Sequence, residues 1–189
     1  MKEQSKAAKR RFNDGYFHSQ YFVGNGIDVG SGDDSLASYA RVFSGIKSIR
    51  EWDKADGDAQ YLSNCPDNSY DFLHSSHCLE HMVDVSIAMQ NWVRVVKSGG
   101  FLIVTVPDFG MYENNVWPSE YNKDHKWAFS MQNLSFEYAI CVPKFFSAVP
   151  NTMLHKVQLI TEFFSPLTFS DQTLLPNPEC CIEIVLQKT

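Results

Sequence analysis

The sequence GIDVGSGDD, Gly26 to Asp34, gives the first clear indication of how this chain folds. It opens as a short β-prone run and stops at Gly30, which predicts a strand that ends in a tight turn. Gly30 and Gly32 let backbone N–H groups approach a ligand closely, because neither carries a side chain. A helical pattern follows at once, and the positive end of that helix would favour an anion. The stretch therefore predicts a ligand-binding turn between a strand and a helix.

The rest of the chain alternates between strand-like and helix-like patterns. After the first strand, we expect strands at residues 47–52, 70–76, 101–107, 156–163 and 181–188. We expect helices at residues 5–20, directly after Asp34, from Val83 to Ser98-Gly99-Gly100, and at residues 131–147. This order predicts a single α/β domain over residues 1–189 with a mostly parallel sheet. Ligands of such sheets bind at the carboxyl ends of the strands.

Composition narrows the class of protein. The 189 residues are 44% hydrophobic and 20% charged, as in ordinary globular domains. The formal net charge of −6 argues against a nucleic-acid partner. No apolar run reaches the ~20 residues that span a membrane, so we expect no membrane partner. Five cysteines without a C-x-x-C pair fit a reducing, cytoplasmic location. A homodimer is left open, and the basic stretch from Lys2 to Arg11 is interpreted as an exposed helix face.

An acidic residue stands at a telling distance from the glycine turn. Asp53 follows Gly32 by 21 residues and ends a predicted strand, about where an acid meets a ribose diol. The dinucleotide pattern G-x-G-x-x-G is absent, because Ser35 stands at its third glycine. Two aspartates after Gly32 would also repel a pyrophosphate. A ligand with a ribose and a positive centre fits better, and S-adenosylmethionine (SAM) is such a ligand.

Four motifs then follow in order between about Gly24 and Phe109: GIDVGSGDD, REWDKADGDAQYL, SYDFLHSSHCLEHMVD and NWVRVVKSGGFLIVTVP. Together they resemble the small standalone class I SAM-dependent methyltransferases. HKVQLITEF and CCIEIVLQK look like the sixth and seventh strands of that family. The resemblance implies a Rossmann-like three-layer α/β sandwich with an antiparallel last strand. It also implies SAM as cofactor and S-adenosylhomocysteine as product.

The resemblance assigns roles to single residues. Asp28 would brace the glycine turn, Asp53 would hold the ribose hydroxyls, and Asp58 would accept a hydrogen bond from the adenine amino group. The other implied cofactor contacts are Gly30, Ser31, Gly32, Ala59, Ser76 and His77. The sequence departs from the family at Asp34, where a small residue is common. The alternative is that the glycines and Asp58 form turns and nothing more.

His77-Cys-Leu-Glu-His81 also fits H-x-x-E-H, the zinc-ligand pattern of the inverzincin peptidases. Zinc ligands at i and i+4 need one continuous helix, whereas residues 71–76 have the pattern of a strand. A convincing third ligand is not found downstream. We therefore expect no metal, and a zinc peptidase is only the remote alternative. Glu80 is expected to begin the next helix, where its charge suits the helix dipole, and His81 is expected to be structural.

Residues 108–130 are too long for an ordinary connection, and polar and aromatic side chains alternate in them. We predict an active-site loop. The aromatic residues expected to form a substrate wall are Tyr112, Trp117, Tyr121 and Trp127. His125 in this loop is the first candidate for a catalytic base, and His77 is the second. The alternatives are a solvated loop histidine at 125 and a buried structural one at 77. Residues 1–23 are expected to form a helical flap.

The predicted function is methyl transfer from SAM to a small-molecule acceptor, a transferase reaction of the EC 2.1.1 type. Oxygen on a sugar, a glycan precursor or another metabolite is the expected accepting atom, and nitrogen, carbon and sulfur stay open. The alternative from another class is a catalytically inactive module that binds SAM or a nucleotide.

Overall fold

The computed structural model describes residues 2–166, 171 and 174–189, and its main sheet has six strands in the order β2-β1-β3-β4-β8-β7. The strands are β1 (Gly24–Val29), β2 (Ile46–Trp52), β3 (Tyr70–Ser76), β4 (Val96–Pro107), β7 (Thr152–Ile160) and β8 (Cys181–Lys188). A smaller sheet pairs β5 (Ala128–Ser130) with β6 (Ala139–Cys141). The α-helices are α1 (Glu3–Phe12), α2 (Val85–Val95) and α3 (Val142–Ser147). Shorter helical turns are the π-helix η1 (Phe17–Tyr21) and the 3-10 helices η2 (Leu36–Val42) and η3 (Leu79–His81).

The strand directions are those of a mostly parallel sheet. β2, β1, β3 and β4 run parallel, and β8 runs antiparallel to both of its neighbours, β4 and β7. In the β4–β8 pair, Phe101 lies opposite Gln187 and Pro107 opposite Cys181. β4 is buried from residue 101 to its end, as the nearly continuous apolar run there requires. The predicted α/β fold with an antiparallel last strand is confirmed.

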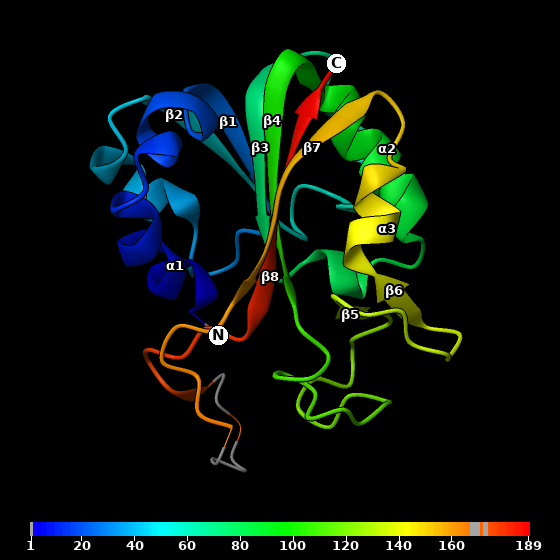
Figure 1. Cartoon of the computed structure of the whole chain (residues 1–189). Coiled ribbons are helices and arrows are strands. Elements are labelled where there is room, and N and C mark those ends of the chain that lie inside the picture. Colours follow the sequence, from blue (N-terminus) through cyan, green and yellow to red (C-terminus); the bar gives the residue numbers. More distant parts are fainter. Residues whose placement is uncertain (1, 167–170, 172–173) are drawn as a thin grey trace.

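Apolar side chains cover both faces of the sheet and form two cores. On one face, Trp92 of α2 belongs to a cluster with Leu73 of β3 and Leu102 of β4. On the other face, Phe22 packs against Phe72 of β3, with ring centroids 5.4 Å apart. Figure 1 shows the resulting layers, with α1 on one side of the sheet and α2 and α3 on the other. The fold is therefore the three-layer sandwich that the resemblance implied.

Two helix predictions are wrong. Of residues 131–147, only the last six are helical, because Pro143 sets the start of α3 and residues 131–138 are irregular. Helix α2 ends at Val95, before the glycines that were expected to cap it. Gly99 and Gly100 lie in β4 instead, and a Cβ at Gly100 would come within 2.5 Å of the carbonyl oxygen of Asp71. None of the helices in the described part of the chain is long and apolar enough to cross a membrane.

The expectation of a solvated basic face is wrong for Lys6, Arg10 and Arg11, which are buried or half-buried and paired, whereas Lys2 and Lys9 are exposed. The Arg11 guanidinium is fully buried, and its Nε lies 2.8 Å from Oε2 of Glu183 on β8. Arg10 lies 3.1 Å from both Glu179 and Glu183. The sequence pattern of α1 could not reveal this, because the carboxylates come from the far end of the chain. The ion pairs fix α1 to the sheet.

Candidate functional site

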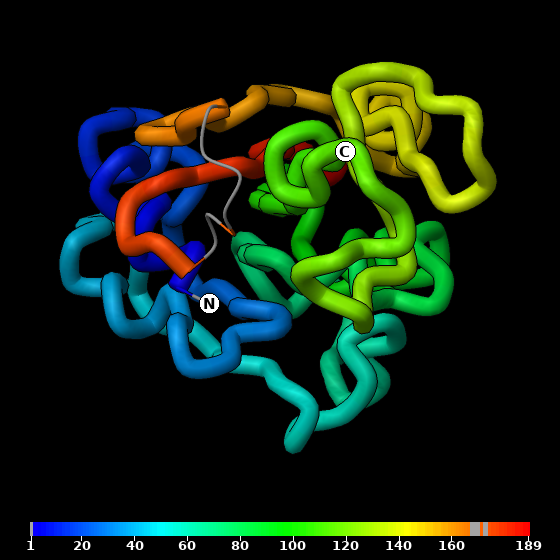
Figure 2. Tube along the Cα trace, turned by 90° about the horizontal axis from the view of Figure 1, so that it is seen from below, coloured from blue at the N-terminus to red at the C-terminus, as the bar shows by residue number. Residues whose placement is uncertain are grey.

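The parallel strands end at the lower side of the molecule in Figure 1, and Figure 2 looks onto that end. The N-terminal end of α1 and the segment after β4 both lie there. Two cavities lie at this end of the sheet, and both are lined by Gly30, His77 and His81. The glycine turn after β1 and the HCLEH turn after β3 therefore meet at one junction.

Every residue predicted to contact the cofactor lines at least one of the two cavities. The smaller cavity measures about 210 Å³, and its predicted members are Asp28, Gly30, Ser31, Gly32, Ser76 and His77. The larger measures about 500 Å³, and its predicted members are Gly30, Asp53, Asp58, Ala59 and His77. The spacing argument for Asp53 thus identified a residue that shares a cavity with the glycine turn.

The glycine turn has a geometry that few other residues could adopt. Gly30 has φ +76°, and a Cβ there would lie 2.6 Å from Sγ of Cys78. Because Gly30 has no Cβ, the HCLEH turn packs directly on the glycine turn. The N–H groups of Gly30 and Ser31 both donate to the carbonyl of Trp52, at 2.8 and 3.2 Å. These two amides are therefore hydrogen-bonded to the end of β2, and contact of Gly30 and Ser31 with the cofactor stays a prediction.

Asp28 stabilises the loop after β1 by accepting hydrogen bonds from it. Its carboxylate is buried and accepts hydrogen bonds from the Leu36 amide at 2.7 Å and the Ser35 hydroxyl at 3.1 Å. Its other oxygen lies 2.6 Å from Nδ1 of His74. Nε2 of that histidine lies 2.9 Å from Arg11. Because arginine can only donate, His74 is neutral with its proton on Nδ1, and burial lowers its pKa.

Asp34, the departure from the family pattern, is used by the N-terminal helix. Its carboxylate accepts from the Ser5 amide at 2.8 Å and from the Ser5 hydroxyl. That hydroxyl also lies 2.6 Å from the hydroxyl of Tyr39 in η2. Glu3 and Gln4 of the same helix line the smaller cavity. Asp34 therefore pins α1 over the glycine turn.

Asp53 and Asp58 lie on the exposed side of the larger cavity. One oxygen of Asp53 accepts from the Lys54 amide at 2.8 Å, and one oxygen of Asp58 accepts from the Gln60 amide at 2.8 Å. Both carboxylates thus keep acceptor capacity for a ligand. Gly57, with φ +131°, lets the chain turn back between them.

His77 lies at the junction of the two cavities. It has the unusual φ of +52°, and its amide donates to Thr105 on β4 at 2.9 Å. Its Nε2 has no hydrogen-bond partner among the described residues. Burial, aided by nearby cationic groups, lowers its pKa to about 3. A base with so low a pKa is a poor proton acceptor at neutral pH, so His77 is better suited to contact a ligand than to act as a catalytic base.

Behind the junction lies a cluster that sequence reasoning missed. Glu80, His81 and His125 each offer one ligand-type atom within 4.8 Å of the other two. The cluster forms because the segment that carries His125 lies along η3, with the Lys126 amide donating to the Glu80 carbonyl at 2.8 Å. Glu80 does not begin α2 but is fully buried beside it, and burial raises its pKa to about 7.

His125 does not line either cavity itself. Its side chain is 1% exposed, and its Nδ1 lies 2.6 Å from Oε1 of the buried Glu113. Its Nε2 faces Glu80 at 3.8 Å. His81 stands between His125 and the cavities, with the two rings in edge contact at 4.9 Å. A direct catalytic role for His125 stays a prediction, and His81 is the better placed histidine.

The four aromatic residues of the predicted substrate wall are not among the residues that line the two cavities. Tyr112 is buried, with its ring 5.2 Å from that of His125. Trp127 donates to the Met82 carbonyl at 2.9 Å and packs against the core. Trp117 contacts Phe136, and Tyr121 accepts from Asn114 at 2.6 Å. Trp127 thus has a packing role, and contact with a substrate stays a prediction for all four.

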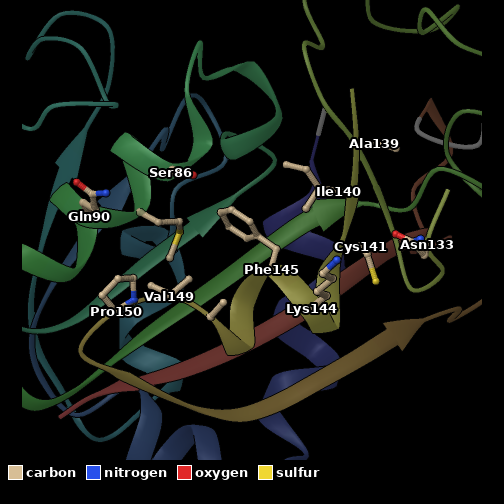
Figure 3. A pocket seen from close by; sticks show the side chains of 12 residues that line it. Ser86, Gln90, Asn133, Ala139, Ile140, Cys141, Lys144, Phe145, Val149 and Pro150 are labelled. Atoms are coloured by element: carbon tan, nitrogen blue, oxygen red, sulfur yellow. The ribbon is translucent and has the colours of Figure 1, made fainter. Parts of the chain in front are cut away.

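A third cavity, of about 500 Å³, lies away from the strand ends and shares no residue with the other two. Figure 3 shows it between α2 and the segment of β6 and α3, with Ile140 and Phe145 among its apolar lining. Its lining lacks the clustered acidic and histidine side chains of the junction. We therefore place the candidate site at the strand ends.

Comparison with known proteins gives a family match. Residues 43–104, from the end of η2 into β4, match the model of a methyltransferase domain. Curated protein sequences give no match to the chain.

Solved structures match over nearly the whole chain. A SAM-dependent methyltransferase from Archaeoglobus fulgidus has a TM-score of 0.63 at 17% identity, covering 100% of this chain and 95% of that chain. A putative SAM-dependent methyltransferase from Listeria monocytogenes has a TM-score of 0.60 at 16% identity, with 100% and 98% covered. The [4+2]-cyclase SpnF has a TM-score of 0.60 at 14% identity, with 96% and 80% covered. The methyltransferase resemblance predicted from the sequence is confirmed by the matched domain, and these solved structures share its fold.

Proposed function

We propose that this chain, a small class I SAM-dependent methyltransferase by its matched domain and its fold, transfers the methyl group of SAM to an oxygen of a small-molecule acceptor. One observation carries the proposal: the glycine turn, Asp53 and His77 line adjoining cavities at the ends of the parallel strands. Ligands of open α/β sheets bind at this place.

The charges of the smaller cavity support SAM over a dinucleotide. Glu3, Asp28, Asp33 and Asp34 all contribute to its lining. Carboxylates favour the sulfonium and the ammonium group of SAM, whereas they would repel a pyrophosphate. In this proposal the methionine part lies in the smaller cavity, Asp53 holds the ribose hydroxyls, and Asp58 faces the adenine. The sulfonium then lies at the junction of the cavities.

The methyl group of a sulfonium is already activated, so the protein mainly positions the acceptor and excludes water. The acceptor oxygen forms a bond to the methyl carbon while the carbon–sulfur bond breaks, and the electron pair goes to sulfur. The acceptor's hydroxyl proton leaves to a base or to water. His81 lines both cavities, Asn122 lines the smaller one and Asp124 the larger, and such hydrogen-bonding groups suit a hydroxyl. This set supports an oxygen acceptor.

The test is titration of SAM and S-adenosylhomocysteine into the purified protein by calorimetry. Asp53→Asn should weaken both affinities at least about tenfold, because it removes a charged acceptor from the ribose. Glu51→Gln is the matched control, since Glu51 is an exposed acid on β2, two residues before Asp53. The control should bind like the unaltered protein. Binding of neither ligand to the unaltered protein would overturn the proposal.

The second candidate is a SAM-binding protein without methyl transfer, and the similarity to a [4+2]-cyclase supports keeping it, because that protein has this fold and is named for another reaction. Turnover separates the two. Formation of S-adenosylhomocysteine with any hydroxylated sugar or metabolite in a panel supports transfer. SAM binding without product on the whole panel supports the module.

A further inference from the structure

Glu80, His81 and His125 form a group of side chains. The methyl-transfer proposal uses His81 alone and leaves Glu80 and His125 without a role. Glu80 is buried at the centre, and neither of its carboxylate oxygens receives a hydrogen bond from another described residue. Burying a carboxylate without a partner is costly, so buried charges are normally paired or bind a metal. The neighbours of Glu80 are Nε2 of His81 at 3.9 Å and Nε2 of His125 at 3.8 Å.

The two histidines are oriented by carboxylates on their far sides. Nδ1 of His125 lies 2.6 Å from Glu113, and Nδ1 of His81 lies 3.1 Å from Asp124. These contacts place the imidazole protons on Nδ1, which leaves the lone pair of each Nε2 facing Glu80. Histidines that bind metals are held in the same way, with the second nitrogen donating to a carboxylate.

Three electron-pair donors therefore face one another across a gap that holds no proton donor from the described residues. At 3.8 and 3.9 Å, the nitrogens and the carboxylate are too far apart for a direct hydrogen bond. Ligands of a tetrahedral Zn²⁺ lie about 3.3 Å apart, so the two nitrogen–carboxylate distances would have to shorten by roughly half an ångström. All three ligand atoms lie within 4.8 Å of one another. Glu80 and His125 are buried, whereas His81 lines both cavities.

We propose that Glu80, His81 and His125 bind a divalent first-row transition cation, with Zn²⁺ as the best fit. Two imidazoles and one carboxylate suit Zn²⁺ or Fe²⁺ better than Mg²⁺ or Ca²⁺, which prefer oxygen ligands. Three protein ligands leave a fourth position open toward the cavities, as in catalytic zinc sites. This departs from the expectation of no metal, and the ligand pair is His81 with His125, not the His77 and His81 of the H-x-x-E-H pattern.

The consequence for chemistry rests on the proposed function. The acceptor's hydroxyl oxygen would bind at the open coordination position of the cation, which would lower the pKa of that hydroxyl. The hydroxyl would lose its proton to solvent, and the resulting alkoxide would attack the methyl carbon as the carbon–sulfur bond breaks. The products would be the methyl ether and S-adenosylhomocysteine. The cation would be neither oxidised nor reduced.

The test is metal binding in the absence of SAM. Protein stripped with a chelator is titrated with ZnCl₂ by calorimetry, and Co²⁺ is used as a spectroscopic probe. We expect one equivalent of Zn²⁺ per chain and visible absorption bands of a tetrahedral Co²⁺ complex. Glu80→Gln and His125→Gln should weaken Zn²⁺ binding at least about 100-fold, and Glu113→Gln about 10- to 100-fold. His155→Gln is the matched control, because His155 is exposed on β7, and it should bind Zn²⁺ normally.

Absence of a bound equivalent in the unaltered protein would overturn this proposal, as would a Glu80→Gln variant that binds Zn²⁺ normally. Glu80→Gln keeps the side-chain shape, and circular dichroism verifies that it folds. If His125→Gln does not fold, the Co²⁺ spectrum of the unaltered protein and the Glu80→Gln titration still decide. SAM titration of the stripped protein is read separately, so SAM binding without metal binding overturns the metal site alone. Metal binding without SAM binding overturns the proposed function alone.

Discussion

Two groups of buried charges in this molecule have opposite characters. The first, the paired chain, runs through Asp28, His74, Arg11 and Glu183, and each member contacts the next at 2.6 to 2.9 Å. The second, the Glu80 cluster, comprises Glu80, His81 and His125, and its Glu80 carboxylate has contacts of 3.8 and 3.9 Å only. Both groups lie near the ends of the parallel strands. The members of the paired chain contact one another within hydrogen-bond distance, whereas the Glu80 carboxylate receives no hydrogen bond from another described residue.

The difference separates structure from function. A buried charge with all its partners fixes one arrangement of the chain, and here it joins α1 to β8 and to the loop after β1. A buried charge without a partner contributes no such stability, so its presence needs another explanation. We infer that the paired chain holds the fold and that the Glu80 cluster serves a ligand. Three predictions test this contrast.

The largest effect is expected for Arg11→Met. This change leaves Glu183 with two of its partners, Arg10 and Lys156, but removes the group that links it to His74. Breaking a buried ion pair from one side costs about 3–5 kcal/mol of the free energy of unfolding, measured by urea denaturation. Lys9→Met is the control on the exposed side of α1, with an expected change within about 0.5 kcal/mol. Equal effects of the two changes would refute the structural role of the paired chain.

The second prediction concerns acid. Burial alone would raise the pKa of Glu183, but Arg11 and Arg10 outweigh it and lower that pKa far below its ordinary value of 4.5. The folded state thus favours the ionised form, which adds stability above pH 4.5 that is lost as the pH falls below this value. Urea unfolding at a series of pH values should show this loss in the unaltered protein and a smaller loss in Glu183→Gln. Asp67→Asn removes an exposed ion pair with Arg94 and is the control; its free energy of unfolding at neutral pH should stay within about 1 kcal/mol of that of the unaltered protein.

The smallest effect is expected for Glu80→Gln in metal-free protein. The carboxylate has no hydrogen-bond partner among the described residues to leave unpaired, and the amide has the same shape. We expect the free energy of unfolding to change by less than about 1 kcal/mol, or to rise. A loss as large as that of Arg11→Met would show that Glu80 stabilises the fold, and the contrast between the two groups would fail.

Much of the candidate site could be predicted from the sequence, because its position depends on local signals and on topology. The glycines after β1 and the acid after β2 lie at strand ends, and parallel strands bring their carboxyl ends to one edge. Alternation of strands and helices was sufficient to place Gly30, Asp53 and His77 together. Their detailed roles were less accessible, since the amides of Gly30 and Ser31 bond to Trp52.

The Glu80 cluster could not be predicted, because it depends on how an irregular segment folds back. His125 reaches Glu80 only because residues near 126 bond to the backbone of η3, with the Lys126 ammonium 2.9 Å from the His81 carbonyl. No periodicity encodes such a contact. The paired chain was hidden for a similar reason, since Arg11 and Glu183 come from opposite ends of the sequence.

The place of β8 has a consequence for how the protein is made. The strand follows both of its neighbours along the chain, yet it lies between β4 and β7 inside the sheet. Until residues 181–188 have left the ribosome, β4 has an unpaired apolar edge and Arg11 lacks Glu183. The six-stranded sheet therefore cannot form until β8 has been synthesised. A premature stop codon shortly before residue 181 would leave the edge of β4 unpaired and the product prone to aggregate.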